Sequence, residues 1–83
     1  MHGYTAGVKQ FLEFVIRYLV EFPDEVVITE SPQGNTTIFR LVMRQTDVGR
    51  IIGRNGQTIQ AIRALLSSSA ARHGHKATLE IIE

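Results

Sequence analysis

The sequence predicts an α+β fold in which helices pack on a three-stranded mixed sheet, with the elements in the order α-β-β-α-α-β. Apolar residues recur at helical spacing in residues 7–22 and again after residue 56. Elsewhere, β-branched and apolar residues alternate with polar ones, which is typical of strands. We expect the 83 residues to form a single domain, with an N-terminal helix over about residues 7–22 and a core region over about residues 36–83.

The first helix is predicted by a complete apolar stripe. Its members are spaced three and four residues apart along one helical face: Val8, Phe11, Leu12, Val15, Ile16 and Leu19. Pro23 does not readily continue a helix, so we expect the helix to end near Phe22. Phe14 and Tyr18 widen the apolar face beyond what a small sheet covers. They either flank the core or form a surface for a partner.

A β-hairpin is predicted next. Residues 26–30 are short and β-branched, and residues 36–43 alternate in polarity. The Ser-Pro-Gln-Gly-Asn segment at residues 31–35 has the composition of a turn that joins two such strands.

Two helices and a strand complete the predicted fold. Thr46 or Asp47 can cap a short helix that ends at Gly53. A longer helix then runs to Gly74 with an inward apolar stripe: Ile59, Ile62, Leu65, Leu66 and Ala70. Residues 76–82 alternate as a closing strand, and the helical connection fits a strand that lies parallel to the second hairpin strand.

The segment Gly53-Arg54-Asn55-Gly56 stands between these two helices. Without Cβ atoms, Gly53 and Gly56 let a ligand approach the backbone, and the N-terminus of the following helix offers unpaired N–H groups to an anion. Arg54 can add a guanidinium group for phosphate oxygens. A plainer interpretation stays open here, in which Gly53 ends a helix and Asn55-Gly56 only turns the chain.

The charges are unevenly distributed, although the formal net charge is only +1. Residues 40–76 contain the single acid Asp47 and seven basic residues, a net charge of +6 around the GxxG segment: Arg40, Arg44, Arg50, Arg54, Arg63, Arg72 and Lys76. Residues 1–39 carry a net charge of −3. This distribution favours nucleic-acid binding. The alternative is that the basic residues are scattered over several faces.

The run Asp47-Val48-Gly49-Arg50-Ile51-Ile52-Gly53-Arg54-Asn55-Gly56 resembles the KH domains, and more narrowly the small bacterial KhpA family. KH domains clamp about four nucleotides with a GxxG loop. The resemblance implies a type II KH fold and a cytoplasmic RNA chaperone or post-transcriptional regulator linked to cell shape. It also implies self-association and pairing with a larger KhpB-like protein. The family commonly has lysine and often glutamine between the glycines, so Arg54 and Asn55 depart in detail but keep the charge.

The resemblance assigns roles to particular residues. Gly53, Arg54, Asn55 and Gly56 are expected to clamp the sugar-phosphate backbone of single-stranded RNA. Further charge is expected from Arg50, Arg63 and Arg44, and a base-facing groove from Ile51, Ile52 and Ile59. For protein contacts, the candidates are Phe14 with Tyr18, or the helix face at residues 67–71.

Other kinds of function receive little support from the sequence. No serine, histidine and acid have a catalytic spacing, and Gln57-Thr58 stand where a Walker loop needs lysine followed by serine or threonine. His73 and His75 lack a third ligand, so we expect no metal site. We therefore expect the protein not to be an enzyme and to need no cofactor. We also expect no membrane span, and the absence of cysteine suits a reducing cytoplasm.

Two other functions remain as alternatives. The protein could be an interaction adaptor with a vestigial KH groove, against which the intact glycines and nearby arginines argue. It could also be a ribosome-biogenesis factor that uses the same groove.

Overall fold

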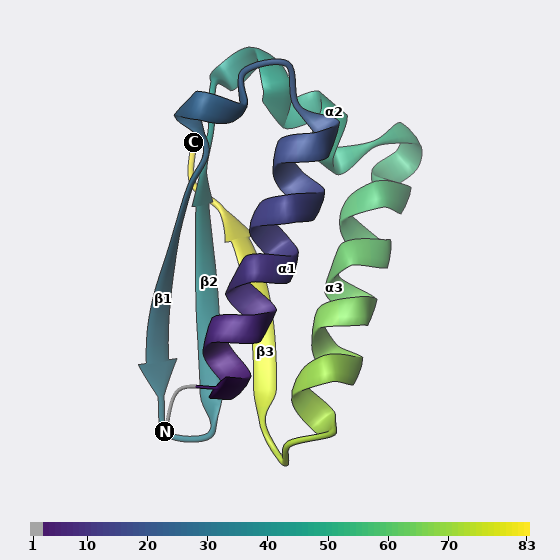
Figure 1. Ribbon diagram of the computed structural model, residues 1–83. Helices are drawn as coiled ribbons and strands as arrows, with labels where there is room; N and C mark the ends of the chain where they lie inside the picture. Colours follow the sequence, from purple (N-terminus) through teal and green to yellow (C-terminus); the bar gives the residue numbers. More distant parts are fainter. Residues whose placement is uncertain (1–2) are drawn as a thin grey trace.

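The computed structural model describes residues 3–83 and has the predicted α+β fold, with a three-stranded mixed sheet (Figure 1). Its elements follow the predicted order: α1 Gly3–Leu19, β1 Val27–Gln33, β2 Thr36–Val42, α2 Val48–Ile52, α3 Gln57–Ala71 and β3 Lys76–Ile81. Short 3₁₀ turns precede β1, α2 and α3 at Pro23–Glu25, Gln45–Asp47 and Arg54–Gly56.

The sheet has the strand order β1-β2-β3. The central strand β2 pairs with β1 antiparallel and with β3 parallel, as the sequence predicted. The chain passes from β2 to β3 through α2 and α3, and α1 and α3 lie side by side over one face of the sheet (Figure 1). This arrangement puts the GxxG segment at one end of the two-layer fold.

The core lies between the helices and the inner face of the sheet. It consists of apolar side chains from all the helices and strands: Val8, Leu12, Ile16, Val20, Val26, Ile28, Phe39, Leu41, Ile51, Ile59, Ile62, Leu66, Ala70, Ala77 and Leu79. Leu65 does not belong to it, although it was predicted in the inward stripe of α3, and its side chain is 57% exposed. Phe14 and Tyr18 are also exposed, which removes the interpretation that they flank the core.

The hairpin is tighter than predicted. β1 continues through Pro32 to Gln33, so that only Gly34 and Asn35 turn the chain. Proline is tolerated there because β1 is an edge strand, where a missing N–H can lie on the unpaired side. Gly34 has a φ of 62°, a left-handed conformation that glycine adopts without a steric cost.

The end of α1 also differs from the prediction, because the helix stops at Leu19 rather than near Phe22. The amides of Glu21 and Phe22 instead donate to the two carboxylate oxygens of Asp47, each at 3.0 Å. The prediction that Asp47 caps the short helix is therefore wrong: it precedes α2 but makes no side-chain capping bond. The Asp47 carboxylate accepts instead from the segment that follows α1.

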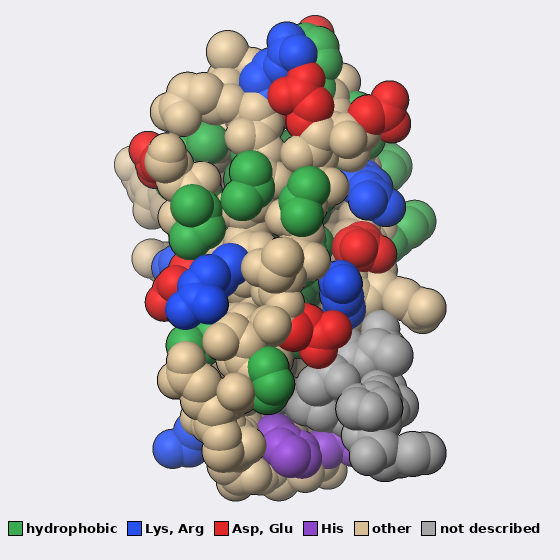
Figure 2. Space-filling view, turned by 90° about the vertical axis from the view of Figure 1, so that its left-hand side faces the viewer, with side chains coloured by type: hydrophobic (Ala, Val, Ile, Leu, Met, Phe, Trp, Pro, Cys, Tyr) green, Lys and Arg blue, Asp and Glu red, His purple; other side chains and the backbone are tan. Residues whose placement is uncertain are grey.

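The outer face of the sheet carries no helix (Figure 1) and mixes apolar and charged side chains. Val27 and Val42 pair across the strands and are about half exposed, while Arg40 forms an ion pair with Glu80 at 3.4 Å. Figure 2 shows the side of the molecule where the edge strand β1 lies, and there charged side chains of both signs are interspersed. No large basic patch is seen in this view (Figure 2).

Candidate nucleic-acid interface

The GxxG turn, residues Gly53–Gly56, connects α2 to α3 through an unusual backbone conformation. Gly53 has φ 76° and ψ 176°, a region almost restricted to glycine. Asn55 and Gly56 then both adopt left-handed conformations, at φ 57° and φ 74°. Asparagine is one of the few residues with a side chain that tolerate this conformation. Three of four residues therefore have positive φ, and the turn is specified by its residue types.

Gly53 is required for a second reason. A Cβ atom built on Gly53 would lie 2.2 Å from Oγ1 and 2.7 Å from Cβ of Thr58, in the first turn of α3. At Gly56 the nearest such contact is 3.8 Å, to the side chain of Gln60. The backbone of the turn is thus packed against α3 at Gly53 and open to solvent space at Gly56.

The N-terminus of α3 is left without the usual negative groups. No acidic residue occurs in its first turn, and Gly56 at the N-cap position has no side chain with which to cap it. The first amides of a helix lack intrahelical acceptors, and the helix dipole concentrates positive charge there. The site can therefore accept an anion from outside the protein.

Two arginines flank the GxxG turn in different states. Arg54 is exposed, and no hydrogen bond or ion pair of its side chain occurs within residues 3–83. Arg50, in the last turn of α2, lies 3.4 Å from Asp47 and 3.8 Å from Glu21 but keeps about half of its side chain exposed. Arg54 is thus an exposed charge without a side-chain partner among the described residues, while Arg50 is held in place by acids.

The other two predicted arginines have protein partners. Arg44 forms an ion pair with Glu25, with its Nε 2.9 Å from the carboxylate, and its guanidinium lies 3.7 Å from the centre of the Phe22 ring. Arg63 donates from Nε and Nη2 to the carbonyl oxygen of Leu79 in β3, at 3.2 and 3.0 Å. The structure thus brings neither of these arginines to the GxxG turn as an unpaired charge.

The three isoleucines predicted for the groove are separated by the fold. Ile51 is fully buried and Ile59 is 5% exposed, and both belong to the core cluster. Ile52 is 36% exposed at the end of α2. Helical geometry explains the difference, since Ile51 and Ile52 are consecutive and point about 100° apart. Ile52 alone is available to a base, while Ile51 and Ile59 anchor the two sides of the turn.

Sequence reasoning missed two residues that shape the site. Asp47 is 1% exposed and joins the end of α1 to α2, and Thr58 packs against Gly53. A signal for Asp47 existed, because it is the lone acid in the basic segment of residues 40–76. No comparable signal marks Thr58, whose role depends on how closely the turn approaches α3.

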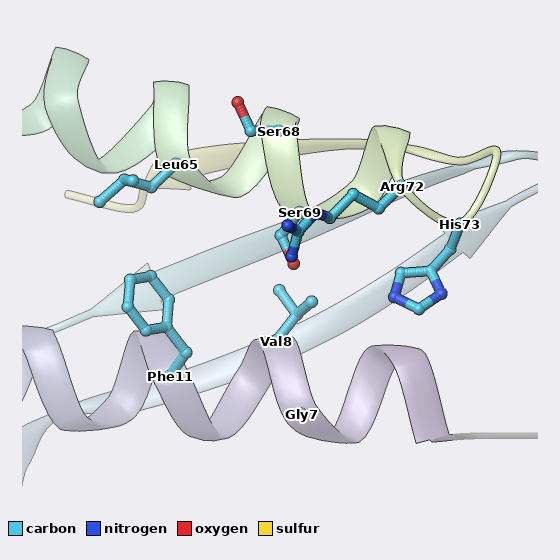
Figure 3. Close-up of a pocket in the computed structure, with 8 residues that line it drawn as sticks. All are labelled: Gly7, Val8, Phe11, Leu65, Ser68, Ser69, Arg72 and His73. Carbon is cyan, nitrogen blue, oxygen red and sulfur yellow. The ribbon is translucent and has the colours of Figure 1, made fainter.

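A second hollow lies away from the GxxG turn, between α1 and α3 (Figure 3). This α1–α3 groove has a volume of about 580 Å³ and is lined by residues of both helices and the turn after α3: Gly7, Val8, Phe11, Leu65, Ser68, Ser69, Arg72 and His73. Phe11 and Leu65 face it from opposite helices (Figure 3) and are 40% and 57% exposed.

Residues 3–83 contain no group of three or more histidine, cysteine or acidic side chains that could hold a metal ion. Across the same residues, no helix combines the length and apolar character needed to cross a membrane.

Comparisons with known proteins give one consistent result. The family model described as KhpA/KhpB, KH domain, matches residues 9–81. The RNA-binding protein KhpA of Chlamydia trachomatis is 45% identical over 75 residues, covering 90% of this chain and 96% of the relative. For the KhpA proteins of Borreliella burgdorferi and Clostridium acetobutylicum, identity is 39% and 34% over 74 residues, covering 89% of this chain and 90% and 99% of the relatives. No solved structure matches the chain.

Proposed function

Because this chain belongs to the KhpA/KhpB family of KH domains, we propose that it binds single-stranded RNA through the GxxG turn, as a non-enzymatic protein of the cytoplasm. The observation that carries the proposal is the pairing of a left-handed, side-chain-poor turn with an uncapped, acid-free helix N-terminus. Backbone N–H groups then meet phosphate oxygens directly. Relatives that match over most of this chain are named RNA-binding proteins, which agrees with this chemistry.

Each flanking residue has a distinct proposed role. Arg54 supplies a guanidinium group to a phosphate and Asn55 keeps the turn in its left-handed conformation. Arg50 adds a second, oriented positive charge, and Ile52 contacts a base. Arg44 and Arg63 contribute less, because Glu25 and the Leu79 carbonyl already engage them.

The double variant Arg54→Asp/Asn55→Asp tests the clamp. It replaces a cation by two anions beside the helix N-terminus, so RNA binding should be lost while the helical circular dichroism stays unchanged. If the wild-type protein neutralises two to four phosphates, its affinity for RNA should fall by roughly 7- to 50-fold when the salt concentration rises from about 50 to 200 mM. The exchange Arg40→Asp on the outer face of the sheet is the charge control. Unaltered RNA affinity in a folded double variant would reject the site.

We further propose that the protein acts as an RNA chaperone or post-transcriptional regulator together with a KhpB-like partner or a second copy. One turn holds only about four nucleotides. Linking two binding modules raises affinity for one RNA without any new contact within each module. The α1–α3 groove is the surface proposed for the protein contact, because Phe11 and Leu65 expose apolar area on both of its sides.

A further inference from the structure

Phe14 and Tyr18 form an exposed aromatic pair on α1 that the GxxG clamp does not use. Their side chains are 72% and 81% exposed, the largest exposures among the big apolar residues described. The ring planes differ by 22° and the ring centres lie 6.4 Å apart. We propose that this aromatic pair is a second RNA contact, which stacks unpaired nucleobases. The inference rests on the proposed RNA-binding function and extends it.

Flat, uncovered rings suit a nucleobase. Every base has a π-face, so stacking on aromatic side chains binds single strands with little sequence preference. The GxxG turn has no such platform, because Phe39 is fully buried and Phe22 is covered by the guanidinium group of Arg44. The aromatic pair therefore supplies a kind of contact that the turn lacks.

The surroundings of the aromatic pair are polar. A hollow of about 470 Å³ at the pair is lined by these side chains: Gln10, Glu13, Phe14, Arg17 and Tyr18. Gln10 and Glu13 can exchange hydrogen bonds with base edges, and Arg17 can contact a phosphate. A protein partner would have to remove water from all three of these groups to reach two rings, which makes the α1–α3 groove the better protein site.

The aromatic pair lies in the last two turns of α1, at the end of the helix that is near α2 (Figure 1). Arg50, next to the turn, lies 3.8 Å from Glu21, and Tyr18 comes three residues before Glu21 in the chain. Phe14 lies four residues further back, about 6 Å along the helix axis. The charges of Arg50 and Glu21 offset each other on this path. A single strand that leaves the turn past Arg50 thus meets Tyr18 first and Phe14 next.

RNA length separates the two contacts in an experiment. The probes are single-stranded RNAs of about 4 nucleotides, which fill only the GxxG turn, and of about 12 nucleotides. In Phe14→Ala/Tyr18→Ala, the affinity for the short RNA should stay unchanged and the dissociation constant for the long RNA should rise at least about fivefold. The slope of the long-RNA affinity against salt concentration should be the same for the variant and the wild type, because stacking displaces no counterions. Val27→Thr, on the outer face of the sheet, is the control.

Tyrosine fluorescence gives an independent readout. The sequence contains two tyrosines and no tryptophan, so Tyr4→Phe leaves Tyr18 as the single reporter. Long RNA should quench its emission and short RNA should not. If the wild-type protein does not bind short RNA, the proposed GxxG clamp is rejected. Quenching of Tyr18 by long RNA then still tests the proposed contact at the aromatic pair.

Three results would overturn the aromatic contact. One is an unchanged affinity of the double alanine variant for long RNA. Another is an equal loss for short and long RNA, which would mean that the aromatic pair supports the fold. The third is a changed sedimentation mass at equal RNA affinity, which would make the surface a protein contact.

Discussion

The two glycines of the GxxG turn are needed for different physical reasons. Gly56 has a positive φ but open space around it, so only backbone strain opposes a side chain there. Gly53 combines a conformation nearly restricted to glycine with close packing against Thr58. The first position therefore depends on the packing of α3, while the second depends only on the local conformation.

Alanine substitutions should separate these two causes. Gly56→Ala should lower the free energy of unfolding by about 1–2 kcal/mol, the cost of a left-handed alanine. Gly53→Ala should lower it by about 3 kcal/mol or more, since crowding adds to the strain. Urea unfolding measures both changes, and Gly49→Ala is the control, because a Cβ at Gly49 meets nothing within 4 Å. Equal effects at Gly53 and Gly56 would contradict the crowding by Thr58.

Two side chains from the segment between β2 and α2 bind the segment between α1 and β1. Asp47 ties the Glu21 and Phe22 amides to the start of α2, and Arg44 connects the end of β2 to Glu25 in the 3₁₀ turn before β1. The Arg44 guanidinium lowers the pKa of the Glu25 carboxyl below its ordinary value of 4.5. A carboxyl with a lowered pKa stabilises the fold when it is ionised.

This connection predicts a pH dependence of stability. The contribution of Glu25 is fully present above about pH 4.5 and is lost as the pH falls through the lowered pKa of the folded state. At pH 7, Glu25→Gln should therefore unfold at a lower urea concentration than the wild type. The difference in urea midpoint between the variant and the wild type should disappear at acid pH. Glu30→Gln is the control, because Glu30 is exposed in β1 and has no ion pair within the described residues. A difference that persists unchanged at acid pH would contradict this role.

The GxxG turn and the α1–α3 groove lie on different parts of the molecule. The GxxG turn lies at the end where α2 meets α3, whereas the α1–α3 groove extends to Gly7 and His73 at the other end of the two helices (Figures 1 and 3). The outer face of the sheet carries both apolar and charged side chains. With this separation, the proposed RNA contact and the proposed protein contact would not exclude each other.

The separation predicts that protein association can be removed without loss of RNA binding. Leu65→Asp places a carboxylate in the α1–α3 groove, where an interface would have to bury it, so association should weaken by at least about tenfold. The affinity for a short RNA should remain the same. Sedimentation velocity over a range of concentrations measures association, with the KhpB-like partner added in a second series, and Thr29→Asp is the control. Equal association of Leu65→Asp and wild type would place the contact elsewhere.

The amino-acid sequence determined the element order, the parallel pairing of β2 with β3 and the position of the GxxG turn. These features depend on local information: the apolar period of α1 and α3, the alternation in β2 and β3, and the backbone freedom of Gly53 and Gly56. The resemblance to KH domains also depends on a short run, residues 47–56. The end of α1 was misjudged because Pro23 was a local signal and Asp47 was not.

Only the tertiary structure decided which predicted residues are available to a ligand. Asp47 reaches amides 25 and 26 residues away, and Arg63 reaches a carbonyl 16 residues away. Ile51 faces the core and its neighbour Ile52 faces solvent because α1 and α3 cover one side of α2. Such pairings are set by how distant elements pack, and the residue types and spacings along the chain do not specify them.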